Sequence, residues 1–123
     1  MEKVCLALPT SLLFKEKKFI GYTPKSFCNY LEIILNPKNQ KFLLRHSASE
    51  DQKTPAEQDP SYKQPIAYIL LLYDDKIFLY ERAPKEASSE VRLASKLSIG
   101  IGGHIEPYDH SPNLNLLISS LQR

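Results

Sequence analysis

The sequence predicts an α/β domain preceded by a strand-rich N-terminal extension, and three observations predict it. Residues 65–73 form a near-continuous apolar run, which is typical of a strand buried on both faces. Three of the four glycines lie between Gly100 and Gly103, and this concentration marks a tight turn or a close backbone approach. Residues 114–121 then carry apolar side chains at helical spacing, so a strand, a glycine-rich turn and a helix are expected in that order.

Length and composition limit the class of protein. The 123 residues are enough for one small domain with a single core, and 42% apolar with 24% charged residues is ordinary for a soluble globular protein. The formal net charge is only +2, so no large basic field predicts a nucleic acid or a membrane as partner. Cys5 and Cys28 have no zinc spacing, and we expect thiols in a reducing compartment, with a disulfide as the less favoured alternative.

The N-terminus does not resemble a targeting segment. Val4–Phe14 is fairly apolar, but Glu2 spoils a positively charged start and Pro9 interrupts the run, with no small-residue cleavage site after it. No apolar run approaches the length that crosses a bilayer. We therefore expect a soluble cytoplasmic protein.

Two regions are predicted along the chain. Residues 1–63 form the N-terminal extension, in which short apolar runs such as Val4–Leu8 and Tyr30–Leu35 alternate with turn signals. Its last part is polar, and residues 47–55 predict a loop because they can bury little apolar surface. Residues 64–123 read as a more compact domain.

A hairpin opens this second region. Residues 65–73 predict its first strand, residues 74–76 a turn and residues 77–80 its second strand. A polar loop is expected at residues 84–91, followed by a short strand at residues 96–101 that runs into the glycines.

A helix is expected next. Ser111 is a suitable N-cap and Pro112 suits the first helical position. One apolar stripe then follows the helical period, at Leu114, Leu117, Ile118 and Leu121. We expect the stripe to face the core.

Residues 97–109, Leu-Ser-Ile-Gly-Ile-Gly-Gly-His-Ile-Glu-Pro-Tyr-Asp, resemble the start of the box of the Nudix (MutT-like) hydrolase superfamily. The family pattern is a Gly, five residues, a Glu, seven residues and Arg-Glu-apolar-x-Glu-Glu-x-Gly-apolar. Gly103 corresponds to the first Gly and Asp109 stands at the first Glu position. Arg123 corresponds to the Arg, after thirteen residues rather than seven, which is similar to a bacterial phosphoesterase-like subgroup with a stretched box.

The resemblance implies a fold and a reaction. The fold is a Nudix-type α/β/α sandwich with a mixed sheet, of which this chain would hold the front portion. The reaction is hydrolysis of a diphosphate linkage in a nucleoside-diphosphate-type substrate, so the implied partner is a phosphorylated small molecule. Mg²⁺ or Mn²⁺ is the implied cofactor, because a divalent ion neutralises phosphate charge while water attacks phosphorus.

The resemblance also implies site residues. Arg123 would orient a glutamate, and Asp109 would serve the geometry of the loop or contact the metal indirectly. Gly103 is a candidate substrate contact through its backbone N–H. Arg82 is a second candidate through its guanidinium, and an exposed arginine at the end of the hairpin is an alternative at least as favoured.

Glu106 and the backbone carbonyl of Gly102 are the candidate metal ligands. The glutamates that hold most of the metal in the family would come after Arg123, so we expect little or no hydrolase activity from the 123-residue chain alone. His104 and Glu106 stand two residues apart and suit one face of a strand, but a solvent-facing or hydrogen-bonded His104 is favoured over a ligand because no third ligand is evident.

Other interpretations stay open. A degenerate Nudix-like module would bind a ligand or a protein without catalysis, and an unrelated α+β interaction domain would carry its glycines by chance. An uncovered sheet or helix face would favour self-association. Tyr68 and Tyr73 are expected to pack in the sheet rather than stack on bases, and residues 15–18 to form a solvated turn rather than a nucleic-acid patch.

Overall fold

The computed structural model describes residues 3–84 and 94–109, which form two compact units. Among these, unit 1 contains residues 3–67 and 104–109, and unit 2 contains residues 68–84 and 94–103. The polar loop expected at residues 84–91 lies almost wholly outside the described residues, as does the expected helix that ends at Arg123. Over the described residues the fold is mixed and strand-rich, with two short helices and several small antiparallel sheets.

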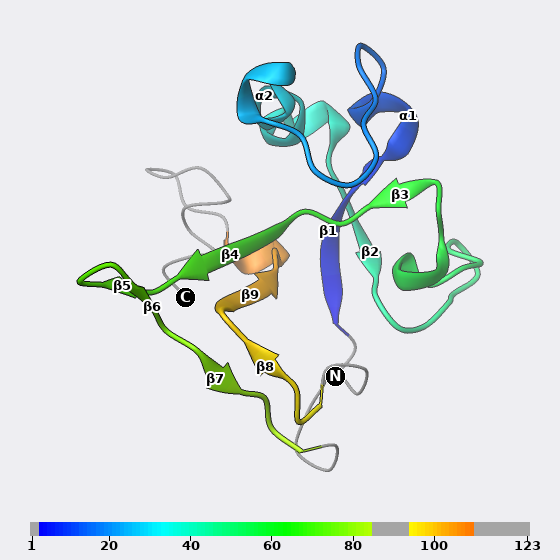
Figure 1. The fold of residues 1–123 in the computed structure, drawn as a ribbon. Helices are drawn as coiled ribbons and strands as arrows, with labels where there is room; N and C mark the ends of the chain where they lie inside the picture. The colour runs from blue at the N-terminus through cyan, green and yellow to red at the C-terminus, as the bar shows by residue number, and fades with distance from the viewer. Residues whose placement is uncertain (1–2, 85–93, 110–123) are drawn as a thin grey trace. The chain divides into compact units, whose positions relative to one another are not determined.

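A three-stranded sheet is the centre of unit 1 (Figure 1). Its middle strand, β1 (Val4–Pro9), pairs antiparallel with β2 (Lys41–Leu44) on one side and with β3 (Tyr62–Lys63) on the other. Val4 lies opposite Leu44, and Leu8 lies opposite Lys63. The apolar run predicted at the N-terminus is therefore a central strand, which is where uncharged, fully buried residues are expected.

The core of unit 1 forms around this strand. Leu6, Leu8 and Ile105 are fully buried, and Ile33 and Ile34 pack against them. The backbone N–H of Leu6 also donates a 2.8 Å hydrogen bond to the carbonyl of Ile105. Residues far apart in the sequence are thereby joined, and the segment that follows the glycines is anchored to β1.

Two short helices, both in the described part of unit 1, lie between β1 and β2 in the sequence. Helix α1 (Thr10–Leu13) continues directly from β1, and helix α2 (Tyr30–Leu35) starts after the 3₁₀ turn η1 (Lys25–Phe27). Asn29 caps α2, because its side-chain oxygen accepts the N–H of Glu32 at 3.2 Å. The apolar run Tyr30–Leu35, which belonged to an extension expected to be strand-rich, is thus helical because a cap precedes it.

The long polar segment after β2 is closed by side-chain hydrogen bonds. The 3₁₀ turn η2 (Pro37–Asn39) precedes β2, and η3 (Ala56–Gln58) lies within the polar segment. The amide of Gln52 accepts the N–H of Leu44 and donates to its carbonyl, both at 2.8 Å. Gln52 therefore satisfies the backbone of β2 where a further strand would otherwise do so.

Unit 2 is built from paired short strands. The strands β5 (Leu72–Tyr73) and β6 (Lys76–Ile77) form a hairpin. The strand β7 (Tyr80–Glu81) pairs with β8 (Leu97–Ser98). The strand β4 (Ile66–Leu70), which begins in unit 1, pairs with β9 (Gly100–His104), which ends there.

The hairpin turn was predicted correctly. Asp74 and Asp75 both have positive φ angles, 47° and 60°, the conformation of a two-residue type I′ turn, which Asp tolerates better than most residues.

Burial of residues 65–73 on both faces was predicted wrongly for the described structure. The run is divided between β4 and β5, and its large side chains stay exposed, with 52% of the surface of both Ile66 and Tyr68 accessible. A sheet of only two strands offers little surface to cover such a strand. Among the described residues, no helix is both long enough and apolar enough to span a membrane.

Candidate functional site

The glycine-rich segment begins with a close contact inside unit 2. Gly100 is buried, and a Cβ atom at this position would overlap the ring of Tyr68. The hydroxyl of Tyr80 donates a 2.6 Å hydrogen bond to the carbonyl of Gly100. Packing therefore explains Gly100, whereas a Cβ at Gly103 would meet nothing within 4 Å.

A tight turn follows β9 in unit 1. The 3₁₀ turn η5 (Pro107–Asp109) brings the Asp109 carboxylate back, so that its Oδ2 accepts the N–H of Glu106 at 2.8 Å. The N–H of Asp109 donates in return to the carbonyl of Glu106 at 3.0 Å. Asp109 is only 5% exposed. The structure thus brings together two of the predicted site residues, and it uses the Asp109 carboxylate to fix the backbone of Glu106.

A cluster of ionisable groups lies beside β1 in unit 1, which we call the polar cluster: Cys5, Arg45, His46, Glu57 and His104. Arg45 Nε lies 2.8 Å from Glu57 Oε1, and His46 Nδ1 lies 3.1 Å from Glu57 Oε2. The Arg45 side chain is only 11% exposed and that of Glu57 is 33% exposed, so the arginine end of this ion pair is the part largely removed from water.

The environment of the polar cluster shifts the pKa of two of its groups in the direction that favours their neutral forms. Burial lowers the pKa of His104, and the positive charge of Arg45 lowers it further. Burial raises the pKa of the Cys5 thiol, although the charge of Arg45 opposes this. The Cys5 thiol donates to Gln64 Oε1 at 3.4 Å. Cys5 is therefore a buried thiol rather than a nucleophile.

Sequence reasoning missed Arg45 and Glu57. The two residues stand twelve positions apart on either side of a polar segment, and no motif or period connects them. The one local signal in the sequence was the change from three apolar residues, 42–44, to the charged Arg45.

The other predicted site residues are described within unit 2. The Arg82 Nε donates to Ser98 Oγ at 3.0 Å, and its backbone N–H donates to the carbonyl of Lys96 at 2.8 Å, so Arg82 fastens the β7–β8 pair. Gly102 and Gly103 lie on β9, and Arg123 lies outside the described residues. Their predicted roles stay predictions.

The acidic side chains of the turn offer limited metal chemistry. Within residues 3–84 and 94–109, no three or more His, Cys, Asp or Glu side chains are grouped so that they could hold a metal ion. Glu106 remains the candidate carboxylate ligand, half-buried and held by its backbone, and carboxylate oxygen is what Mg²⁺ prefers.

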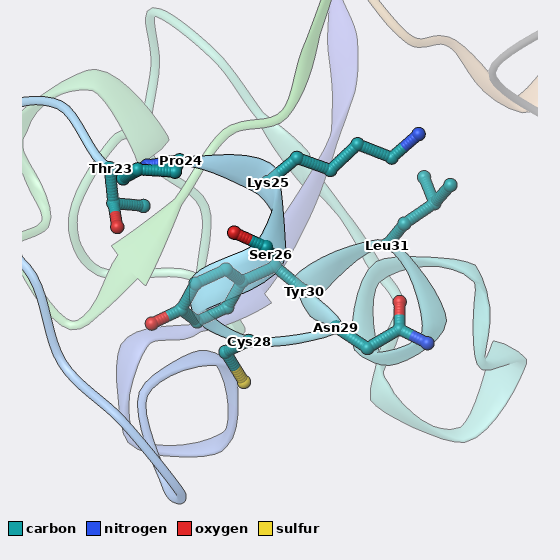
Figure 2. A pocket seen from close by; sticks show the side chains of 8 residues that line it. All are labelled: Thr23, Pro24, Lys25, Ser26, Cys28, Asn29, Tyr30 and Leu31. Atoms are coloured by element: carbon teal, nitrogen blue, oxygen red, sulfur yellow. The ribbon is translucent and has the colours of Figure 1, made fainter.

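A separate hollow of about 790 Å³ opens on the surface of unit 1, and Figure 2 shows the side chains around it. None of the predicted site residues lines it. Its wall comes from the segment around η1 and the start of α2: Thr23, Pro24, Lys25, Ser26, Cys28, Asn29, Tyr30 and Leu31.

One known protein shares part of this sequence. The chain is 46% identical over 56 residues to the protein YmaB of Bacillus subtilis (strain 168). The matched stretch covers 46% of this chain and 26% of YmaB, so the chain spans about a quarter of the relative that it matches. No family model and no solved structure matches the chain.

Proposed function

We propose that this chain is the front portion of a Nudix-type hydrolase, with the α/β/α sandwich of that family. It would cleave a diphosphate linkage in a nucleoside-diphosphate-type substrate with Mg²⁺ or Mn²⁺. The observation that carries the proposal is the turn after β9, in which the buried Asp109 carboxylate fixes the backbone of Glu106. A carboxylate on a fixed backbone is what a metal-assisted phosphate site requires.

The proposed roles come from the resemblance to the Nudix box, and the geometry of the turn supports that of Asp109. Asp109 is a positioning residue, because its carboxylate closes the turn. Glu106 would hold the divalent ion, which supplies Lewis-acid stabilisation when bound, and Gly102 keeps the ligand role that the resemblance implies. Arg82, Gly103 and Arg123 keep the roles that the resemblance implies, with the first two at the substrate phosphates.

Hydrolysis by the protein isolated from its source tests the proposal. We expect release of a phosphorylated product from a nucleoside-diphosphate-linked substrate with Mg²⁺ or Mn²⁺, and none with a chelator. Glu106→Gln should lower the rate at least tenfold. The matched control Glu50→Gln, in an exposed loop of unit 1, should leave the rate unchanged. Equal rates in both variants, or no metal-dependent product from any diphosphate-linked substrate, would contradict the proposal.

The 123-residue chain alone should show little or no activity in the same assay, because the family's metal-binding glutamates are not among its residues. Metal-dependent turnover by this chain would contradict that part of the proposal.

A non-catalytic binding module is the second candidate. The observation that favours it is the engagement of Asp109 in a structural hydrogen bond, which occupies one oxygen of one of the two local carboxylates. A nucleoside diphosphate should then raise the melting temperature of the protein isolated from its source, with no product formed over long incubation. Product formation decides between the two candidates.

A further inference from the structure

A loop of unit 1 carries the most exposed large apolar side chains of the described residues. Ile20 is 90% exposed and Tyr22 is 89% exposed, and they flank Gly21, whose φ of +79° makes the chain turn there. Figure 1 shows this loop, in blue, projecting beside α1. We define the docking loop as residues 15–25.

The docking loop is fastened from inside, so its exposed tip is a defined feature. The rings of Phe14 and Phe19 meet edge to face at 5.4 Å, and Phe19 lies 5.3 Å from the ring of Tyr30. The Tyr30 hydroxyl donates to the carbonyl of Lys17 at 2.7 Å. Phe19 therefore points inward as an anchor, while its neighbour Ile20 stays in solvent.

Charge on the docking loop indicates the kind of partner. It holds four lysines and one glutamate, a net charge of +3, whereas the whole chain has a net charge of only +2. All four lysines are exposed, and Lys17 also lies 5.0 Å above the ring of Phe27. Positive charge is thus concentrated around the most exposed apolar tip of the described residues. The low overall charge predicts no membrane partner, whereas this local concentration favours an anionic one.

We propose that the docking loop binds an anionic lipid surface, with Ile20 and Tyr22 inserted at the interface and the lysines at the level of the headgroups. Tyr is favoured at membrane interfaces, and basic residues gain affinity from anionic lipid. A single-stranded nucleic acid would need several open ring faces, but Phe14, Phe19 and Tyr30 pack against one another. The inference is independent of the proposed hydrolase.

A single tryptophan can test the proposal, because the chain has none of its own. Tyr22→Trp places the probe at the tip, and Tyr73→Trp is the matched control, since Tyr73 is 84% exposed in unit 2. We expect a blue-shifted emission for Tyr22→Trp with vesicles of equimolar phosphatidylcholine and phosphatidylglycerol. We expect no shift with phosphatidylcholine alone or at high salt, and none for Tyr73→Trp.

Charge and apolar variants in the Tyr22→Trp background complete the test. Replacing Lys15 and Lys18 by Gln should weaken vesicle binding about fivefold for each lysine, whereas the exposed pair Lys38 and Lys53 serves as the control. Ile20→Ser should also weaken it. The proposal is overturned by equal emission shifts at both tryptophan positions or by a shift of Tyr22→Trp without anionic lipid. A shift of Tyr22→Trp with a single-stranded oligonucleotide but not with vesicles would overturn it as well. A shift of Tyr22→Trp that depends on protein concentration without vesicles would indicate a second copy and would also overturn it.

Discussion

Asp109 shows how one buried side chain can organise a turn. Its carboxylate satisfies the N–H of Glu106, and the turn cannot reorganise without exposing that group or leaving it unpaired. We expect Asp109→Ala to lower the free energy of unfolding by about 1–3 kcal/mol, the usual cost of an unsatisfied buried group. Asp109→Asn keeps an acceptor oxygen and should cost less. Urea denaturation measures both variants, and equal losses would mean that the hydrogen bond is not what stabilises the turn.

His104 should make stability depend on pH. The pKa of His104 is lowered in the folded protein by burial and by Arg45. Between that lowered value and the ordinary pKa of 6.5, the unfolded chain therefore binds more protons than the folded protein. The stability that neutral His104 provides is present above pH 6.5 and is lost as pH falls through the lowered value. We expect denaturation midpoints to fall with pH over that window, and less steeply in His104→Gln. An unchanged slope would remove His104 as the cause.

At the scale of elements, the pairing of β4 with β9 depends on a missing side chain. Gly100→Ala should cost about 1–3 kcal/mol, because the added Cβ would overlap the ring of Tyr68. Gly103→Ala on the same strand is the control and should stay within about 0.5 kcal/mol, since the space there is open. Thermal unfolding compares the two. Adding Tyr68→Ala should abolish most of the difference, and a difference that persists would place the cause in the backbone.

The elements that the sequence predicted well are those fixed by neighbouring residues. Turn signals marked off the apolar run Val4–Leu8 in an extension expected to contain strands, and this run lies in β1. The turn predicted at residues 74–76 is found at Asp74 and Asp75, while Lys76 already belongs to β6. Tyr30–Leu35 illustrates the limit, because a short apolar run fits a strand or a helix until the Asn29 cap decides.

The candidate site was less accessible from the sequence, because its contacts join distant residues. The turn that ends at Asp109 was expected as a loop, but the use of its carboxylate depends on burial that no local pattern records. The ion pair of Arg45 and Glu57 is likewise a product of the fold.

At the scale of the whole molecule, the exposed strands of unit 2 predict self-association. Residues 68–73 carry no charge, and Ile69, Leu70 and Leu71 are 37%, 46% and 47% exposed. Uncharged strands with an open edge lack the lysines that prevent edge-to-edge pairing, and two-stranded sheets are marginally stable alone. We therefore expect the 123-residue chain to form concentration-dependent oligomers in light scattering coupled to size exclusion.

A matched pair of variants locates the surface that associates. Leu70→Lys should shift the population toward the monomer, because a charge on β4 opposes both apolar contact and strand pairing. Ile20→Lys alters an even more exposed apolar residue, but on the docking loop of unit 1, and should leave the mass distribution unchanged. A monomer at all concentrations would contradict self-association. Loss of oligomers in Ile20→Lys alone would instead move the contact to the docking loop and would explain its exposed tip by a second copy rather than by lipid.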